Sequence, residues 1–191
     1  MNSDELQREL DAMHPPPNPL LLELERRNAK DDIPVVSRAT GRFLSTIVAA
    51  MQANRILEVG TGYGYATLWM ALAQPRAGKI WTMDPNVHRT DVARTYFERA
   101  GEDDYIEVFN TPALELLENF PQRNLDVVFV AAKEADSLEY LQLIVPMLKL
   151  SGLAIFDDCL GMPGFAKGFL RHPALDATIL PFGLGIGARR S

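Results

Sequence analysis

The chain has 191 residues, of which 47% are hydrophobic and 23% charged, and its formal net charge is −6. This length and composition fit one globular domain with a sizeable core, and the acidic balance argues against nucleic acid as a partner. The single cysteine, Cys159, excludes an intrachain disulfide and fits a reducing compartment. The sequence has no apolar run of membrane-spanning length, and its polar start does not resemble a signal peptide. We therefore expect a cytoplasmic protein with no membrane partner.

The first 32 residues predict a helical arm. Leu6 and Leu10 have helical spacing, but the prolines that follow His14 end that pattern. Pro19 suits the first turn of a second helix over residues 20–29. We expect this arm, residues 1–32, to serve as a flap or a dimerisation element beside a main domain at residues 33–191.

A strand, a glycine turn and a helix are predicted over residues 55–70, after a helix for which Ser37 is the N-cap. Gly60 and Gly62 lie in the turn and Glu58 directly precedes it. An α/β sheet presents backbone N–H groups to a nucleotide with this arrangement. Glycines let the chain bend sharply and let a ligand approach the backbone. The stretch therefore predicts a nucleotide-type site at the end of the first strand.

Strands alternate with helical segments through residue 156. The apolar runs are 55–59, 79–83, 105–109, 125–130 and 153–156. This alternation implies a parallel, doubly wound sheet. The run 125–130 is the most continuously apolar, and we expect it at the centre of the sheet.

The pattern changes after residue 156. Residues 159–173 are rich in glycine and proline, and we expect a loop there. The runs 177–180 and 185–188 lie too close together for a crossover helix, so these strands should be antiparallel. The predicted fold is α/β: a Rossmann-like, doubly wound, mostly parallel seven-stranded sheet with an antiparallel C-terminal hairpin. NAD-binding Rossmann domains usually lack this hairpin, whereas the methyltransferase sheet has it.

Several short motifs follow one another along the chain. They are Val35-Val36-Ser37, Gly41, Phe43-Leu44, LEVGTGYGY from Leu57, Asp84, Pro112-Ala113-Leu114, Asp157-Asp158-Cys159-Leu160, Leu180-Pro181-Phe182-Gly183-Leu184-Gly185 and Arg189. In their order and spacing, these motifs resemble the S-adenosylmethionine-dependent O-methyltransferases of the catechol and caffeoyl-CoA type. The resemblance covers about residues 33–189, and it implies that residues 33–191 form a methyltransferase domain.

The resemblance implies S-adenosylmethionine as the cofactor and assigns its contacts. Glu58 would meet the positively charged methionine end through a charge-assisted bond. The backbone of Gly60, Thr61 and Gly62 would lie close to the cofactor, and Asp84 would accept hydrogen bonds from the ribose hydroxyls. The other cofactor-binding residues that it implies are Val36 at the entrance, Tyr65, Pro85, and Ala113 at the adenine.

The chain departs from the family pattern around the acceptor. The family holds a divalent cation, Mg²⁺ or another, between one acid after the fourth strand and two residues after the fifth. Asp157 and Asp158 match the second half, but Ala131 occupies the first position and its methyl group cannot ligate. The resemblance implies Lys133 and Asp157 as catalytic residues, with Lys133 as the general base. The family often has a serine at the position of Ala66, so the resemblance implies that one side-chain hydrogen bond to the cofactor is missing.

The sequence therefore predicts an S-adenosylmethionine-dependent O-methyltransferase that acts on a small catechol-like or phenolic acceptor, and the resemblance implies a homodimer. Two alternatives stay open. A cofactor-binding regulatory protein that has lost catalysis would explain Ala131 and a 159–173 segment that is shorter than in the family. An NAD-dependent oxidoreductase is the other alternative, and Glu58 and the closing hairpin argue against it.

Overall fold

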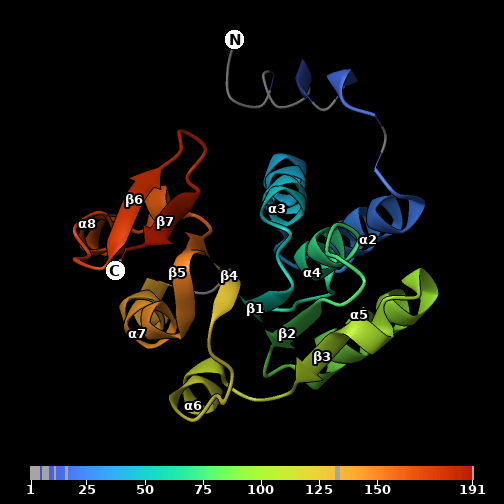
Figure 1. Ribbon diagram of the computed structural model, residues 1–191. Helices are drawn as coiled ribbons and strands as arrows, with labels where there is room; N and C mark the ends of the chain where they lie inside the picture. The colour runs from blue at the N-terminus through green and yellow to red at the C-terminus, as the bar shows by residue number, and fades with distance from the viewer. Residues whose placement is uncertain (1–4, 6–8, 11, 16, 132–133, 191) are drawn as a thin grey trace.

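The computed structural model describes residues 5, 9–10, 12–15, 17–131 and 134–190. Within these residues, seven strands form one sheet in the order β3-β2-β1-β4-β5-β7-β6 (Figure 1). The strands are β1 (Arg55–Val59), β2 (Lys79–Met83), β3 (Ile106–Phe109), β4 (Leu125–Val130), β5 (Leu148–Phe156), β6 (Leu175–Ile179) and β7 (Gly185–Arg189). The α-helices are α2 (Pro19–Lys30), α3 (Arg38–Met51), α4 (Tyr65–Ala71), α5 (Val87–Ala100), α6 (Ala113–Glu118), α7 (Glu134–Ile144) and α8 (Pro163–Leu170). Short 3-10 helices are η1 (Asp103–Tyr105), η2 (Val145–Met147) and η3 (Cys159–Gly161).

The direction of the strands matches the predicted fold class. Strands β1 to β5 pair in parallel, and β7 is antiparallel to both β5 and β6. The predicted Rossmann-like sheet with an antiparallel hairpin is thus confirmed. The strand order reverses between β1 and β4, so the carboxyl ends of these strands border a crevice of the kind in which α/β proteins bind ligands.

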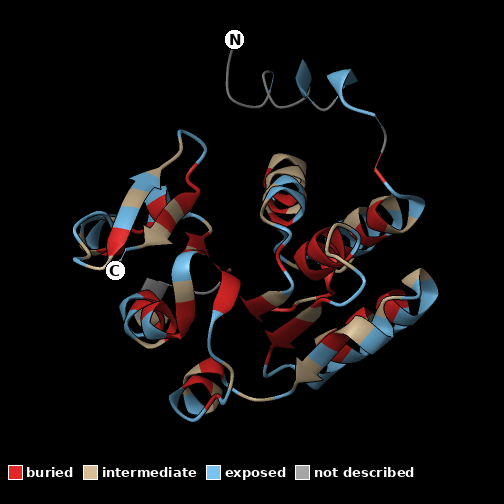
Figure 2. Cartoon of the chain, viewed as in Figure 1, coloured by how far each residue is buried: buried red, intermediate tan, exposed pale blue. Residues whose placement is uncertain are grey.

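Alternate residues of the central strands face two separate cores. In β1, Ile56 packs in one core with residues of α2, α3, α4 and α5, whereas Leu57 packs in the other with residues of α6, α7 and α8. Strand β4 is buried at every position, as expected of a strand covered on both faces. Figure 2 shows buried residues along the strands and exposed residues on the outer sides of the helices. No helix in the described ranges has the length and apolar character needed to cross a bilayer.

Helix α2, in the described second part of the N-terminal arm, packs against α4. Leu21 and Leu24 of α2 are almost fully buried in the first core. The helix begins as predicted at Pro19, and Asn18 caps it by accepting a hydrogen bond from the N–H of Leu20 at 2.9 Å. The division of the chain into residues 1–32 and 33–191 stays a prediction.

The expectation of a loop at residues 159–173 is wrong, because α8 lies within that segment. Pro163 occupies the first position of this helix, where a missing N–H costs nothing. Phe165 and Phe169 lie one turn apart and pack on Phe156 of β5, with ring centroids 4.6 and 5.5 Å away. This contact between distant segments stabilises a helix that local composition disfavours.

Strand β5 begins at Leu148, five residues before the predicted start at residue 153. Its pairing with β4 shifts register between Leu125 and Val127, and Ser151 has a positive φ of 61°. The irregular start of the strand carries exposed residues, which is why the apolar pattern did not include it.

Candidate functional site

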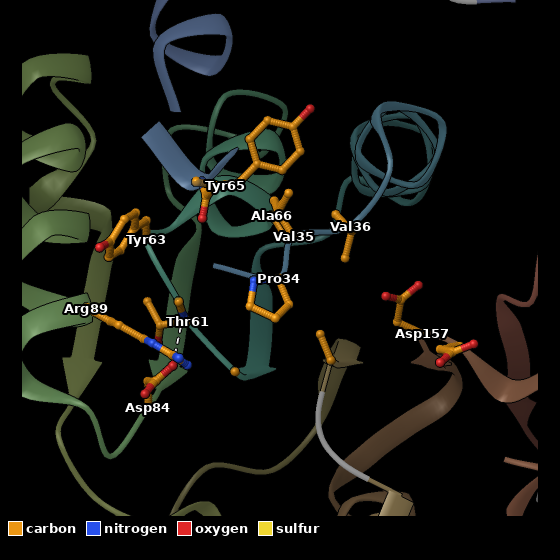
Figure 3. Close-up of a pocket in the computed structure, with 15 residues that line it drawn as sticks. Pro34, Val35, Val36, Thr61, Tyr63, Tyr65, Ala66, Asp84, Arg89 and Asp157 are labelled. Carbon is orange, nitrogen blue, oxygen red and sulfur yellow. Dashed lines mark hydrogen bonds between the residues drawn. The ribbon is translucent and has the colours of Figure 1, made fainter. Parts of the chain in front are cut away.

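A cavity of about 360 Å³ opens at the carboxyl ends of β1, β2, β4 and β5, where the strand order reverses. This volume lies in the range of small-molecule sites, about 300–1,000 Å³. The residues that line the cavity are Asn28, Pro34, Val35, Val36, Gly60, Thr61, Gly62, Tyr63, Tyr65, Ala66, Asp84, Arg89, Ala131, Asp157 and Asp158. In Figure 3, Asp84 and Arg89 lie on one side of the view, Asp157 lies on the other, and Val36 and Ala66 lie between them.

The glycine turn after β1 forms one wall of the cavity. Gly60 has φ 100°, and a side chain there would meet the carbonyl oxygen of Ala131. Gly62 has φ 52°, and no described atom lies within 4 Å of the place that a Cβ would take. Both values belong to the left-handed region that favours glycine. The turn therefore exposes bare backbone to a ligand.

Asp84 is fixed at the end of β2 by two backbone N–H groups. Its Oδ2 accepts from Gly62 and its Oδ1 accepts from Asn86, each at 2.9 Å. The residue is 6% exposed, yet each carboxylate oxygen has a further lone pair for a ligand. A carboxylate held in this way is suited to the two neighbouring hydroxyls of a ribose.

Glu58 is completely buried and lies behind the cavity wall. Its Oε2 accepts hydrogen bonds from the hydroxyls of Thr67 and Thr82, the latter at 2.5 Å, while Oε1 has no partner among the described residues. Thr82 also bonds Thr61, a lining residue, at 2.7 Å. Burial raises the pKa of Glu58 to about 7, and the charge of Asp84 adds to this rise. A polar chain thus connects the wall to a buried carboxyl group.

Ala131, Asp157 and Asp158 form the wall at the ends of β4 and β5. The N–H of Asp157 bonds the carbonyl of Val130 at 2.9 Å, which continues the strand pairing. Burial raises the pKa of Asp157, as does the negative charge of Asp158. The Oδ1 of Asp158 accepts from the N–H of Gly161 at 3.3 Å. This end presents a half-buried carboxyl group to the cavity.

The described side chains at the ends of β4 and β5 do not form the three-ligand cation site that the resemblance implied. Across the residues that the structure describes, no group of three or more His, Cys, Asp or Glu side chains is arranged to hold a metal ion. Ala131 lines the cavity with a methyl group in place of the third ligand. Among the described side chains that line this end of the cavity, Asp157 and Asp158 carry the oxygen ligands that Mg²⁺ prefers.

Helix α2, which belongs to the N-terminal arm, forms another wall of the cavity. Asn28 is only 1% exposed, lines the cavity, and donates from Nδ2 to the carbonyl of Leu24 at 2.8 Å. On either side of it, Glu25 accepts from the Tyr65 hydroxyl at 2.6 Å, and Asp31 accepts from the Tyr63 hydroxyl at 3.1 Å. The arm therefore contributes directly to the site.

The cavity brings together most of the residues predicted from the sequence. These are Val36, Gly60, Thr61, Gly62, Tyr65, Asp84, Asp157 and Asp158. Three predicted cofactor residues do not line it: Glu58 lies behind its wall, Pro85 is exposed, and Ala113 is buried at the start of α6. Lys133 lies outside the described residues, so its catalytic role stays a prediction.

Five lining residues had not been predicted from the sequence. Pro34, Val35 and Tyr63 adjoin predicted residues in the chain, so the predicted motifs marked their neighbourhood. Asn28 and Arg89 come from helices α2 and α5, and only tertiary packing brings them to the cavity.

A mostly parallel sheet with a closing hairpin, and a cavity at its reversal point, define a methyltransferase-type Rossmann-like protein. A family model described as O-methyltransferase matches residues 13–167. The chain belongs to this O-methyltransferase family. The predicted resemblance to S-adenosylmethionine-dependent enzymes of the catechol and caffeoyl-CoA type is confirmed.

Individual relatives agree with the family match. The chain is 30% identical to a catechol O-methyltransferase of Mycobacterium tuberculosis over 160 residues, 76% of this chain and 73% of that protein. It is 32% identical to caffeoyl-CoA O-methyltransferase 1 of Eucalyptus globulus over 144 residues, 72% of this chain but 58% of the plant protein's length. The fold matches that of an O-methyltransferase from Bacillus cereus solved in complex with S-adenosylhomocysteine, with a TM-score of 0.84, 23% identity and 97% coverage of both chains.

Proposed function

We propose that the cavity binds S-adenosylmethionine and that the protein transfers its methyl group to an oxygen of a small catechol-like or phenolic acceptor. The observation that carries this proposal is one cavity that joins Asp84, suited to a ribose, with Asp157, suited to an acceptor hydroxyl. Membership of the O-methyltransferase family supports it. The relatives are named as enzymes, and none of the comparisons favours a protein that has lost catalysis.

In this proposal the ribose lies at Asp84, whose oxygens keep lone pairs beside the N–H groups of Gly62 and Asn86. The sulfonium end follows the backbone of the glycine turn, past Val36 and Tyr65. We place the adenine near Pro85 and Ala113, which follow β2 and β3 in the sequence.

Glu58 would interact with the cofactor through the wall rather than in the cavity itself. Its carboxyl group reaches Thr61 through Thr82. Burial favours the neutral acid, whereas a nearby sulfonium or ammonium would favour the carboxylate. We expect cofactor binding and deprotonation of Glu58 to be coupled for this reason.

In the transfer step the acceptor oxygen attacks the methyl carbon while the carbon–sulfur bond breaks, and S-adenosylhomocysteine leaves. The protein mainly aligns the oxygen and removes water from it. We propose that Asp157, which lines the cavity, accepts a hydrogen bond from the acceptor hydroxyl. Lys133 is the group that we propose takes the hydroxyl proton, since the resemblance assigns it that role.

We derive no step through a metal ion, because the described donors do not fit a three-ligand site. A divalent cation, if bound, would be held by Asp157 and Asp158 with mostly solvent ligands, and weakly. The cytoplasm as the location, and a homodimer formed through the arm, are parts of the same proposal. Light scattering on the purified chain would measure its oligomeric state.

A methyl-transfer assay tests the proposed function. The full chain is incubated with S-adenosylmethionine carrying a labelled methyl group and a panel of catechols, phenols and amines, with Mg²⁺ or with a chelator. We expect labelled methyl ethers of at least one hydroxyl acceptor. Cofactor binding without transfer to any acceptor would contradict the enzymatic assignment, and transfer to amines alone would contradict the oxygen acceptor.

A further inference from the structure

Three polar residues, Glu25 and Asn28 of α2 and Asp31 at its C-cap, are spaced three apart, so they follow one side of the helix and its end. The two outer members hold the hydroxyls of Tyr65 and Tyr63. These tyrosines flank Gly64 at the start of α4. Asn28 therefore faces the region between them, and it lines the cavity there.

The outer contacts make this arrangement rigid. Arg38 of α3 binds both oxygens of Glu25, at 3.0 and 2.6 Å. Burial opposes ionisation of Glu25, but the hydrogen bonds from Arg38 and Tyr65 outweigh it and lower the pKa. Burial and the Glu25 carboxylate raise the pKa of Tyr65, which keeps its hydroxyl protonated as a donor. Asn28 is thus held in a fixed frame beside the cavity.

The Asn28 amide has hydrogen-bonding capacity that the described residues do not use. Nδ2 donates to the carbonyl of Leu24, an acceptor, and this fixes which end of the amide is the nitrogen. The one bond leaves the Oδ1 acceptor and the second N–H for a ligand. Because Asn28 is 1% exposed and lines the cavity, a ligand in the cavity is well placed to use these two groups.

Other polar groups on this side of the cavity are already engaged. The hydroxyls of Tyr63 and Tyr65 donate to Asp31 and Glu25, and the Thr61 hydroxyl bonds Thr82. Ala66, which also lines the cavity here, carries no polar atom in its side chain. The amino-acid end of S-adenosylmethionine bears an ammonium and a carboxylate, and both need hydrogen-bond partners in a buried site.

We propose that Asn28 binds the amino-acid end of the cofactor and replaces the hydrogen bond that Ala66 lacks. Oδ1 accepts from the α-ammonium group, and the second N–H donates to the carboxylate. Helix α2 is then part of the cofactor site and not only a covering element. This inference rests on the proposed function, since it requires S-adenosylmethionine or S-adenosylhomocysteine in the cavity.

The test compares two ligands that differ only in the proposed contact region. S-adenosylhomocysteine carries the amino-acid end, and 5′-methylthioadenosine lacks it. In the variant Asn28→Leu, which keeps the volume, we expect S-adenosylhomocysteine to bind about 10- to 150-fold more weakly, the loss of one hydrogen bond to a charged group, and methylthioadenosine to bind unchanged. Adding Ala66→Ser to Asn28→Leu should restore part of the lost affinity. Arg26→Ala, at an exposed position of the same helix, is the matched control and should change neither ligand.

A measurement on the wild-type chain avoids any effect of Asn28→Leu on folding. The side-chain amide resonances of Asn28 in a ¹H–¹⁵N spectrum should move on addition of S-adenosylhomocysteine and stay in place with methylthioadenosine. The proposal would be overturned if Asn28→Leu lowered the affinities for both ligands equally. It would also be overturned if the Asn28 amide resonances did not move on addition of S-adenosylhomocysteine. A wild-type chain that does not bind S-adenosylhomocysteine at all would instead overturn the proposed function.

Discussion

Glu58 is a carboxyl group that the fold removes completely from water. Two threonine hydroxyls donate to its Oε2, and its Oε1 has no partner among the described residues. The sequence correctly suggested an acid next to the glycine turn. It could not reveal that this acid lies behind the wall, because the side of β1 to which a residue points depends on which helices cover each face.

The buried state of Glu58 predicts a pH-dependent stability. Its pKa is raised from 4.5 to about 7, so the folded protein keeps a proton that the unfolded chain releases. The stabilising contribution is complete below about pH 4.5 and is lost as the pH rises through 7, with a slope of at most about 1.4 kcal/mol per pH unit. Urea denaturation at pH 5, 6, 7 and 8 should show the unfolding free energy of wild type falling relative to Glu58→Gln. Parallel curves for the two proteins would contradict this expectation.

Replacing Ala131 by aspartate should allow the chain to bind a metal ion more tightly. It lines the cavity beside Asp157 and Asp158, so Ala131→Asp adds a third carboxylate at the position that the family uses. Calorimetry should detect Mg²⁺ binding to Ala131→Asp that is at least about ten-fold tighter than to wild type, or about 1.4 kcal/mol. Ala131→Asn is the control, because it adds a neutral oxygen of similar size. Equal Mg²⁺ affinities of wild type and Ala131→Asp would show that these three positions do not converge.

Helices α3 and α4 pack so closely that one glycine sets their separation. The indole of Trp69 lies over Gly41, and the Arg42 guanidinium lies 5.6 Å from the centre of the Trp69 ring. Trp69 also meets Tyr65 edge to face, with centroids 6.3 Å apart. Because Tyr65 lines the cavity, this contact between helices helps to position the cofactor site.

A side chain at Gly41 would overlap the Trp69 ring. Overpacking of a core costs about 1–3 kcal/mol, so Gly41→Ala should lower the unfolding free energy by that amount in urea denaturation. Gly164→Ala in α8 serves as the matched substitution, since no described atom lies within 4 Å of the added methyl group. Alanine favours a helix by up to about 1 kcal/mol over glycine, so Gly164→Ala should be neutral or stabilising. A loss of stability no larger for Gly41→Ala than for Gly164→Ala would contradict the packing described.

At the scale of the whole molecule, the sequence predicted the strands of the sheet better than the helices that pack around it. Strands β1, β2 and β4 have the predicted bounds, because β1 ends at Gly60, β2 ends at Asp84-Pro85, and β4 is one continuous apolar run. Helix α8 was missed, since distant aromatic contacts stabilise it against its glycine and proline content. Asn28 reaches the cavity because α2 packs beside the glycine turn. The local sequence pattern of α2 does not predict this tertiary contact.

Calorimetric titration of the full chain with S-adenosylhomocysteine, with NADH as the comparison ligand, tests the assignment of the cavity most directly. We expect S-adenosylhomocysteine to bind at one site per chain and NADH not to bind. Asp84→Ala should weaken that binding at least about ten-fold, because the ribose hydroxyls lose a charged acceptor, while thermal unfolding checks that the variant is folded. Binding of NADH but not of S-adenosylhomocysteine, or equal S-adenosylhomocysteine affinities of wild type and Asp84→Ala, would contradict the assignment.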